Sequence, residues 1–197
     1  MDLIALYDEL LEKHGKQGWW PLLKEGNFVY DGKSPEGNEV FEVIAGCILM
    51  QNTQFDPNVT KTLRQLREEG VLTPHSMVKA DDETIRDLIK SSGYYNQKTS
   101  YLNSISTFLL NEETLPPSRS DLLNVKGVGK ETCDTILLYA FEQPEFVIDT
   151  YTERVLEDRG REPKSYNKLK SMFEHVLDDV EMYKEFHALL VEEGKSL

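Results

Sequence analysis

The sequence predicts an all-α fold. Along most of its 197 residues, apolar side chains recur at intervals of three and four positions, the spacing that places them on one face of a helix. No segment alternates convincingly between apolar and polar residues, as a half-buried strand would. Glycines and prolines separate the periodic segments and indicate the turns.

The N-terminal quarter begins and ends with a predicted helix. Apolar spacing predicts an opening helix over residues 2–14 and a strongly buried one over residues 40–50, with a loop over residues 26–38 between them. The second helix ends in Gln51-Asn52-Thr53, where amide and hydroxyl groups can reach a partner. The alternative is that these residues only cap the helix.

Two adjacent tryptophans follow the opening helix. Trp19 and Trp20 precede Pro21, and consecutive side chains cannot face the same way on a helix. At least one indole therefore either fills the core or lines a cleft.

The middle of the chain predicts more helices and an exposed turn. Pro57 starts a helix that runs through Glu69, and Asp81 caps a short helix to Lys90. The glycine turn over residues 91–98 then presents Tyr94, which suits stacking on bases, and a lysine that suits phosphate. Alternatively, the adjacent Tyr95 packs against the next helix.

A glycine hairpin organises the second half. Ser118 caps a short helix, and Gly127 and Gly129 then flank a valine, so the backbone can turn sharply with positive φ and expose its amides. A helix follows, and its N-terminus predicts an anion site that suits phosphate. The alternative is an ordinary helix C-cap and loop. Asp149 lies one helix and one short loop further on, before a helix over residues 150–158 and two amphipathic stripes.

Composition limits the classes of function. The net charge of -13 argues against a generally basic DNA-binding surface, but the acidic runs are typical of solvated helix ends, whereas Lys98, Lys126 and Lys130 lie on the glycine turns. Cys47 and Cys133 lie in apolar patterns and are expected to be buried. No apolar run reaches about 18 residues, so we expect a cytoplasmic protein with no membrane partner. The four histidines have no metal-ligand spacing and are interpreted as ordinary surface or core residues: His14, His75, His175 and His187.

Four motifs together resemble one known superfamily. The chain is similar to the helix-hairpin-helix, glycine-proline-aspartate (HhH-GPD) base-excision DNA glycosylases with the endonuclease III-like fold. The matches are the hairpin Gly127-Val128-Gly129, the aspartate motif Ile148-Asp149-Thr150, the wedge-bearing helix end Gln51-Asn52-Thr53 and the second DNA-contacting turn over residues 93–98. The resemblance implies one unit over residues 1–197. Its two helical subdomains flank a cleft, one over residues 38–142 and the other over residues 1–37 and 143–197.

Two departures narrow the resemblance. Relatives that also cleave the DNA backbone carry a lysine nucleophile two residues past the second hairpin glycine. This chain has Glu131 there and Lys130 one position early. A carboxylate cannot form the Schiff base that lyase chemistry requires. The four-cysteine loop of many relatives is also absent, so we expect no iron–sulfur cluster.

The subfamily follows from the aromatic motifs. The chain looks most like the 3-methyladenine DNA glycosylases that lack an iron–sulfur cluster. This resemblance implies that Asp149 is the catalytic carboxylate, and it implies a base pocket formed by Trp19, Trp20, Pro21 and Phe55. It implies DNA contacts by Gln51, Asn52, Tyr94, Lys98, Lys126, Gly127, Gly129 and Lys130. It also implies a possible monovalent cation at the carbonyls of Val125 and Val128.

These features predict a monomeric, monofunctional glycosylase that removes alkylated purines from damaged double-stranded DNA. One alternative is a glycosylase of the same fold for mismatched or oxidised bases. Another is a DNA-structure binder that kept the fold and lost the chemistry, which the acidic net charge favours.

Overall fold

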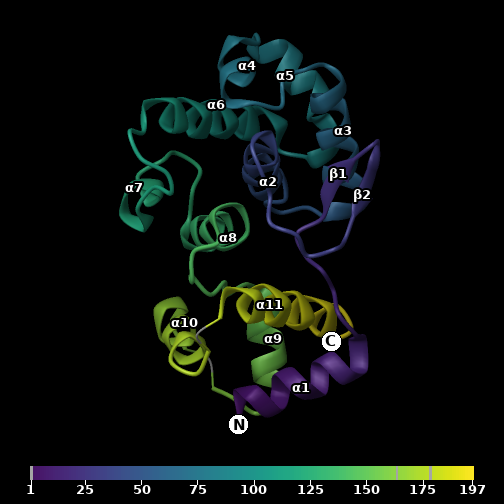
Figure 1. The fold of residues 1–197 in the computed structure, drawn as a ribbon, viewed down its shortest axis with the longest axis vertical. Helices are drawn as coiled ribbons and strands as arrows, with labels where there is room; N and C mark the ends of the chain where they lie inside the picture. The colour runs from purple at the N-terminus through teal and green to yellow at the C-terminus, as the bar shows by residue number, and fades with distance from the viewer. Residues whose placement is uncertain (1, 163, 178) are drawn as a thin grey trace.

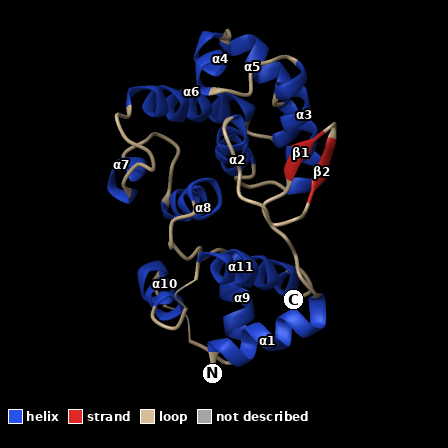
Figure 2. Cartoon of the chain, viewed as in Figure 1, coloured by secondary structure: helices blue, strands red, loops and turns tan. Residues whose placement is uncertain are grey.

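The computed structural model describes residues 2–162, 164–177 and 179–197, and within them the chain is mostly helical (Figure 2). The helices are α1 (Leu3–His14), α2 (Asn38–Leu49), α3 (Thr60–Glu68), α4 (Pro74–Lys79), α5 (Asp82–Leu88), α6 (Tyr95–Asn111), α7 (Arg119–Leu123), α8 (Lys130–Phe141), α9 (Thr150–Asp158), α10 (Tyr166–Glu174) and α11 (Val180–Gly194). A kinked turn (Phe55–Val59), in which the backbone of Asp56 is extended, precedes α3, and a 3₁₀ turn (Lys90–Ser92) precedes α6. The all-α prediction is confirmed.

The helices form two groups that meet at α8 (Figure 1). Helices α1, α9, α10 and α11 pack together at one end, and helices α2 to α8 form the other. Helix α8 packs against α2 on one side and against α11 on the other. The loop after α8 is anchored by the buried residues Phe146, Val147 and Ile148, which fix where the next helix starts.

A small sheet departs from the predicted loop. Strands β1 (Leu22–Lys24) and β2 (Asn27–Val29) pair antiparallel around Glu25 and Gly26, whose φ values of 48° and 82° are both left-handed. Two successive positive φ values are the signature of the type I′ hairpin turn. Three-residue strands are too short to reveal an alternating pattern in the sequence.

The sheet also shifts a predicted boundary. We predicted residues 1–37 to lie with the C-terminal helices, but β1 contacts α2, and the Leu23 amide donates to the buried Glu42 carboxylate at 2.7 Å. Residues 22–29 therefore lie with helices α2 and α3, while α1 packs on α11.

Several local predictions are confirmed. The carboxylate of Asp81 accepts from the Thr84 amide at 2.9 Å, and the Ser118 hydroxyl accepts from the Asp121 amide at 3.1 Å, as helix caps do. Cys47 and Cys133 are buried free thiols. Within the described residues, every helix is too short or too polar to cross a membrane.

Candidate DNA-binding and catalytic site

The hairpin turns at Gly127 because another side chain requires glycine there. Its φ is +89°, and a Cβ at this position would lie 2.2 Å from the ring of Tyr101. Gly129 differs from expectation: its φ is -87°, so only the first glycine adopts a positive φ. The space around the Cα of Gly129 is open, with no atom within 4 Å of an added Cβ. This glycine therefore leaves room for a close partner rather than relieving backbone strain.

The hairpin and the end of α2 border an open groove of about 530 Å³. Gly129 is the N-cap of α8 and has no side chain to accept from the first-turn amides. Those amides and the positive end of the helix favour an anion at this mouth. Gln51 crosses the groove, since its side-chain amide donates to the Gly127 carbonyl at 2.9 Å and to the Thr132 hydroxyl at 3.1 Å. Asn52 is exposed beside it with a left-handed φ of 54°.

The second turn presents one aromatic ring to solvent. Tyr94 is 65% exposed and has a left-handed φ of 47° as the N-cap of α6. Tyr95 beside it is less exposed, at 37%.

Lys98 is placed differently from our prediction of a DNA contact. Its side chain is 2% exposed, and its ammonium donates to the Leu49 carbonyl at 2.8 Å and to the Ser92 carbonyl at 2.6 Å. These carbonyls precede the two loops that carry Gln51 and Tyr94. The buried ammonium is unavailable to a phosphate and instead joins the two loops.

Lys126 and Lys130, the two lysines of the hairpin, are exposed. Lys126 donates to the Ser100 hydroxyl at 2.9 Å, and Lys130 lies 6.0 Å from the ring centroid of Tyr166. Val125 and Val128 bury their side chains, and the Val125 carbonyl accepts from the Val128 amide at 3.1 Å. A carbonyl oxygen has a second lone pair, so this turn is compatible with a cation, which stays a prediction.

Asp149 is the N-cap of α9 and faces α11. Its Oδ1 accepts from the Thr152 amide at 2.7 Å, and its Oδ2 lies 3.4 Å from Nε2 of His187. Burial alone would raise the pKa of Asp149, but the hydrogen bond and charge of His187, and then the Thr152 amide, hold it below its usual value. The side chain is 12% exposed, so an ionised carboxylate stays reachable from solvent.

Glu131 shares the electrostatic field of Asp149. It is the second residue of α8, and its pKa is raised, first because surrounding atoms desolvate its carboxyl group and then because Asp149 is negative. The geometry therefore brings a second carboxylate, and not an amine, toward Asp149.

The predicted pocket residues form an aromatic cluster. The Phe55 ring centroid lies 4.8 Å from that of Trp19 and 5.4 Å from that of Trp20. Trp20 is 3% exposed and packs on Gly46, where an added Cβ would lie 2.6 Å from the indole. Trp20 is thus a core residue in this structure, like the buried Pro21 next to it. Trp19 is only half-buried and is the indole that a base can reach more readily.

Our interpretation of all four histidines as ordinary residues missed His187. Trp20 lies 5.7 Å from Tyr139 between ring centroids, and Tyr139 lies 5.8 Å from His187, so these rings connect the aromatic cluster to Asp149. Glu185, two residues earlier on α11, accepts from the Gln17 and Gly18 amides that lead into Trp19. The sequence did hold one indication of this contact. Glu185 and His187 flank Phe186 in an apolar helix, and polar groups that are buried need partners.

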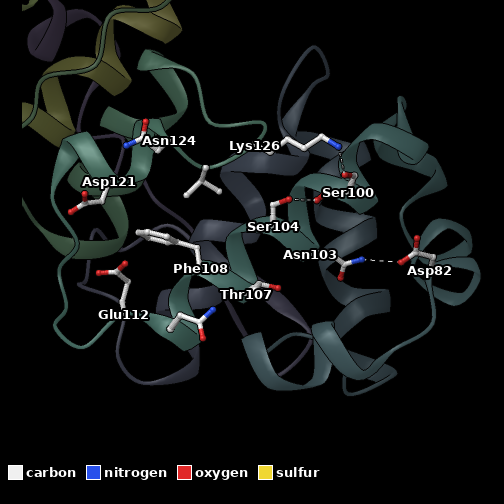
Figure 3. Close-up of a pocket in the computed structure, with 12 residues that line it drawn as sticks. Asp82, Ser100, Asn103, Ser104, Thr107, Phe108, Glu112, Asp121, Asn124 and Lys126 are labelled. Carbon is white, nitrogen blue, oxygen red and sulfur yellow. Dashed lines mark hydrogen bonds between the residues drawn. The ribbon is translucent and has the colours of Figure 1, made fainter.

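A second groove lies between α6 and α7 (Figure 3). It measures about 720 Å³, and Phe108 lies in it beside Glu112 and Asp121. Its wall carries the carboxylates of Asp82, Glu112 and Asp121 together with the ammonium of Lys126.

Solved structures with the same architecture define the class of protein. The H. pylori 3-methyladenine DNA glycosylase MagIII, crystallised with 1,N6-ethenoadenine, superposes with a TM-score of 0.82 at 26% identity, over 100% of this chain and 98% of that one. Endonuclease III trapped covalently on DNA superposes with a TM-score of 0.74 at 22% identity, over 97% and 85% of the two chains. The fold is that of the endonuclease III-like glycosylases.

The sequence comparisons place the chain in one family. Residues 45–178 match the HhH-GPD superfamily of base excision DNA repair proteins. A candidate DNA repair glycosylase of Methanocaldococcus jannaschii is 35% identical over 98% of this chain and 87% of its own. Endonuclease III of Thermotoga maritima is 35% identical over 61% of this chain and 56% of its own. This protein belongs to the HhH-GPD superfamily of base excision DNA repair proteins.

Proposed function

We propose that this protein hydrolyses the N-glycosidic bond of alkylated purines, such as 3-methyladenine, in DNA and performs no lyase step. The observation that carries the proposal is the placement of Asp149, an accessible carboxylate with a lowered pKa, opposite Glu131 at the position of the lyase lysine. The full-length likeness to the H. pylori 3-methyladenine glycosylase supports the choice of base.

The hairpin groove would hold the DNA backbone. The first-turn amides of α8 and the exposed Lys126 and Lys130 suit phosphate oxygens, and such contacts position the duplex without reading its sequence. The target nucleotide must leave the stack, at a cost of a few kcal/mol. Gln51, which lines the groove, would fill the vacated space, and the exposed ring of Tyr94 would stack beside the orphaned base.

Asp149 would act on the sugar. When the bond between C1′ and the base nitrogen breaks, the electron pair of that bond leaves with the base. It neutralises the positive charge of the alkylated purine, so no general acid is needed. The carboxylate stabilises the positive charge that develops on the sugar. A water oxygen then bonds to C1′ and gives its proton to Asp149.

The aromatic cluster would select the base. A cationic purine is attracted to an electron-rich aromatic face by about 0.5–2 kcal/mol, whereas a normal base gains no such term. The half-buried Trp19, packed on Phe55, supplies that face.

A base-release assay tests the substrate. Duplex DNA treated with a methylating agent is incubated with the wild type and with Asp149→Asn, and the free bases are separated by chromatography. We expect 3-methyladenine from the wild type only. Release of uracil, thymine or 8-oxoguanine from matched duplexes, without 3-methyladenine, would favour a mismatch or oxidised-base glycosylase. Tight binding with no release would favour a non-catalytic DNA-structure binder.

Borohydride trapping tests the missing lyase step. Borohydride reduces a Schiff base between enzyme and sugar to a stable adduct, so we expect none here, while a lyase-competent glycosylase serves as positive control. A trapped adduct would overturn the monofunctional assignment. If the wild type forms the adduct and Lys130→Ala does not, Lys130 is the nucleophile.

A further inference from the structure

The hydroxyl of Tyr139 fixes the tautomer of His187. The phenol is 1% exposed and lies 3.0 Å from the Lys184 carbonyl and 2.8 Å from Nδ1 of His187. Burial is the main cause of the raised pKa of Tyr139, so the phenol keeps its single proton. A backbone carbonyl only accepts, so that proton goes to Lys184 and the phenol oxygen accepts from Nδ1–H.

This assignment determines what His187 presents to Asp149. A neutral imidazole with its proton on Nδ1 has a lone pair on Nε2. Nε2 is buried and lies 3.4 Å from Oδ2 of Asp149. A lone pair facing a carboxylate is repulsive, so one of the two groups must carry a further proton.

The surroundings of Asp149 place that proton on His187. The Thr152 amide donates to Oδ1, and the N-terminus of α9 favours negative charge at this cap. We propose that His187 is a positioning residue, held by Tyr139, whose protonated Nε2 keeps Asp149 ionised and aimed at the sugar. The inference rests on the proposed role of Asp149 in base release.

The other charged groups around this contact do not supply the same effect. From α8, Glu131 interacts electrostatically with both Asp149 and His187 and adds negative charge. On α11, the Lys184 ammonium pairs with Glu142 and Glu181, and Glu185 accepts from the Gln17 and Gly18 amides. Removing the imidazolium would leave Asp149 beside the negative Glu131 without an opposing charge, which favours protonation of the Asp149 carboxylate.

The pH dependence of base release tests the proposal. Single-turnover rates are measured from pH 4 to 9 on whichever base the wild type releases, and DNA affinity is measured separately. An opposite charge at this range shifts a carboxyl pKa by about 1–3 units, so His187→Leu should move the acid limb of the rate profile up by about one pH unit or more. His187→Gln retains an N–H donor without the charge and should show a smaller upward shift.

Two matched variants sharpen the test. Tyr139→Phe removes the acceptor of Nδ1–H and should move the acid limb upward as His187→Leu does. Glu131→Gln removes a like charge and should move it downward. An acid limb that is unchanged or lowered in both His187 variants would overturn the proposal, since a merely structural role lowers the folded fraction without moving the limb.

A titration of Asp149 distinguishes a failure of the proposed His187–Asp149 ion pair from a failure of the proposed function. The ¹³C carboxyl signal of Asp149, assigned by its loss in Asp149→Asn, is followed against pH in the wild type and His187→Gln. A higher midpoint in the variant supports the ion pair even if the wild type releases no base. An unchanged midpoint overturns it even if 3-methyladenine is released.

Discussion

Two aspartates, the fully buried Asp134 and the partly exposed Asp149, lie fifteen positions apart and serve different ends. Asp134 is fully buried on α8, where Arg119 donates to both of its oxygens at 2.6 and 3.0 Å and the Tyr166 hydroxyl donates at 2.7 Å. Asp149 accepts from one amide and faces His187 at 3.4 Å. The first carboxylate accepts three hydrogen bonds and is fully buried, whereas the second accepts from one amide and is 12% exposed.

The difference shows that burial and negative charge do not identify a catalytic carboxylate. Asp134 joins α7, α8 and α10, since Tyr166 and the nearby Lys170 come from α10, so its network ties the two helical groups together. Asp149 holds its own helix start and leaves hydrogen-bonding capacity for substrate. Unsatisfied capacity at an accessible edge is therefore the better guide to chemistry.

The largest expected effect comes from Asp149→Asn. Losing the charge at the sugar should lower single-turnover base release by about 10³-fold, which is about 4 kcal/mol of transition-state stabilisation. Asparagine is an equally good N-cap, so the start of α9 should be retained. The rate is compared per folded molecule, because His187 loses its counter-charge. Base release within tenfold of the wild type would mean that Asp149 is structural, as Asp134 is.

Asp134→Asn should have the opposite pattern. Removing one partner of a buried ion pair costs at most about 3–5 kcal/mol. Arg119 is 28% exposed and would keep only the more distant carboxylate of Glu145, at 3.7 Å. Urea unfolding measures this loss, and the base-release rate per folded molecule should stay at the wild-type level. A rate that falls while the protein remains folded would show that Asp134 acts on the reaction.

The sequence was sufficient for the fold class and for much of the hairpin site. Helical periodicity predicted most helices, and the glycine motif located the groove, because both signals are local in the chain. Asp149 could be singled out because it follows the hairpin closely. The short β-hairpin was missed, because three-residue strands show no period.

Contacts between distant segments were beyond sequence reasoning. Nothing near Lys98 in the chain indicates that its ammonium meets the carbonyl of Leu49, which belongs to another helix. In the same way, His187 meets Asp149 only because α11 crosses the start of α9. Burial and partners of a polar side chain depend on tertiary packing, and that information is not carried by spacing.

Lys98 extends the comparison to a buried cation that, like Asp134, has its partners satisfied. Lys98→Met leaves two buried carbonyls unpaired, and we expect a loss of about 1–3 kcal/mol in the free energy of unfolding. DNA affinity should also fall, because the loops bearing Gln51 and Tyr94 lose their common anchor. Base release from bound DNA should be less affected than affinity.

The pH dependence of this stability has a defined sign. Burial lowers the pKa of Lys98 from 10.5 to about 8, so between these values the unfolded chain binds more protons than the folded one. The wild type should therefore gain stability relative to Lys98→Met as pH rises from 8 toward 10.5. Lys98→Arg stays charged throughout and should show no such gain. If the difference in the free energy of unfolding between the wild type and Lys98→Met becomes smaller as pH rises, the ammonium is not buried as described.

The smallest effect tests whether the aromatic cluster belongs to the Asp149 region. Trp19→Leu keeps an apolar side chain but removes the π face. Loss of about 0.5–2 kcal/mol of cation–π attraction corresponds to roughly a 2- to 30-fold slower single-turnover release of 3-methyladenine. Affinity for undamaged duplex should stay unchanged, because Trp19 lies apart from the hairpin groove.

Tyr166→Phe is the matched control for Trp19→Leu. It removes the hydroxyl that donates to Asp134 and keeps the aromatic ring, so it should cost about 0.5–1.5 kcal/mol of stability or slightly more. Release of 3-methyladenine should be unaffected, since the change touches only Asp134. Equal slowing by both substitutions would mean that the two aspartate regions are coupled through α8, and base recognition could then not be assigned to the Trp19 cluster alone.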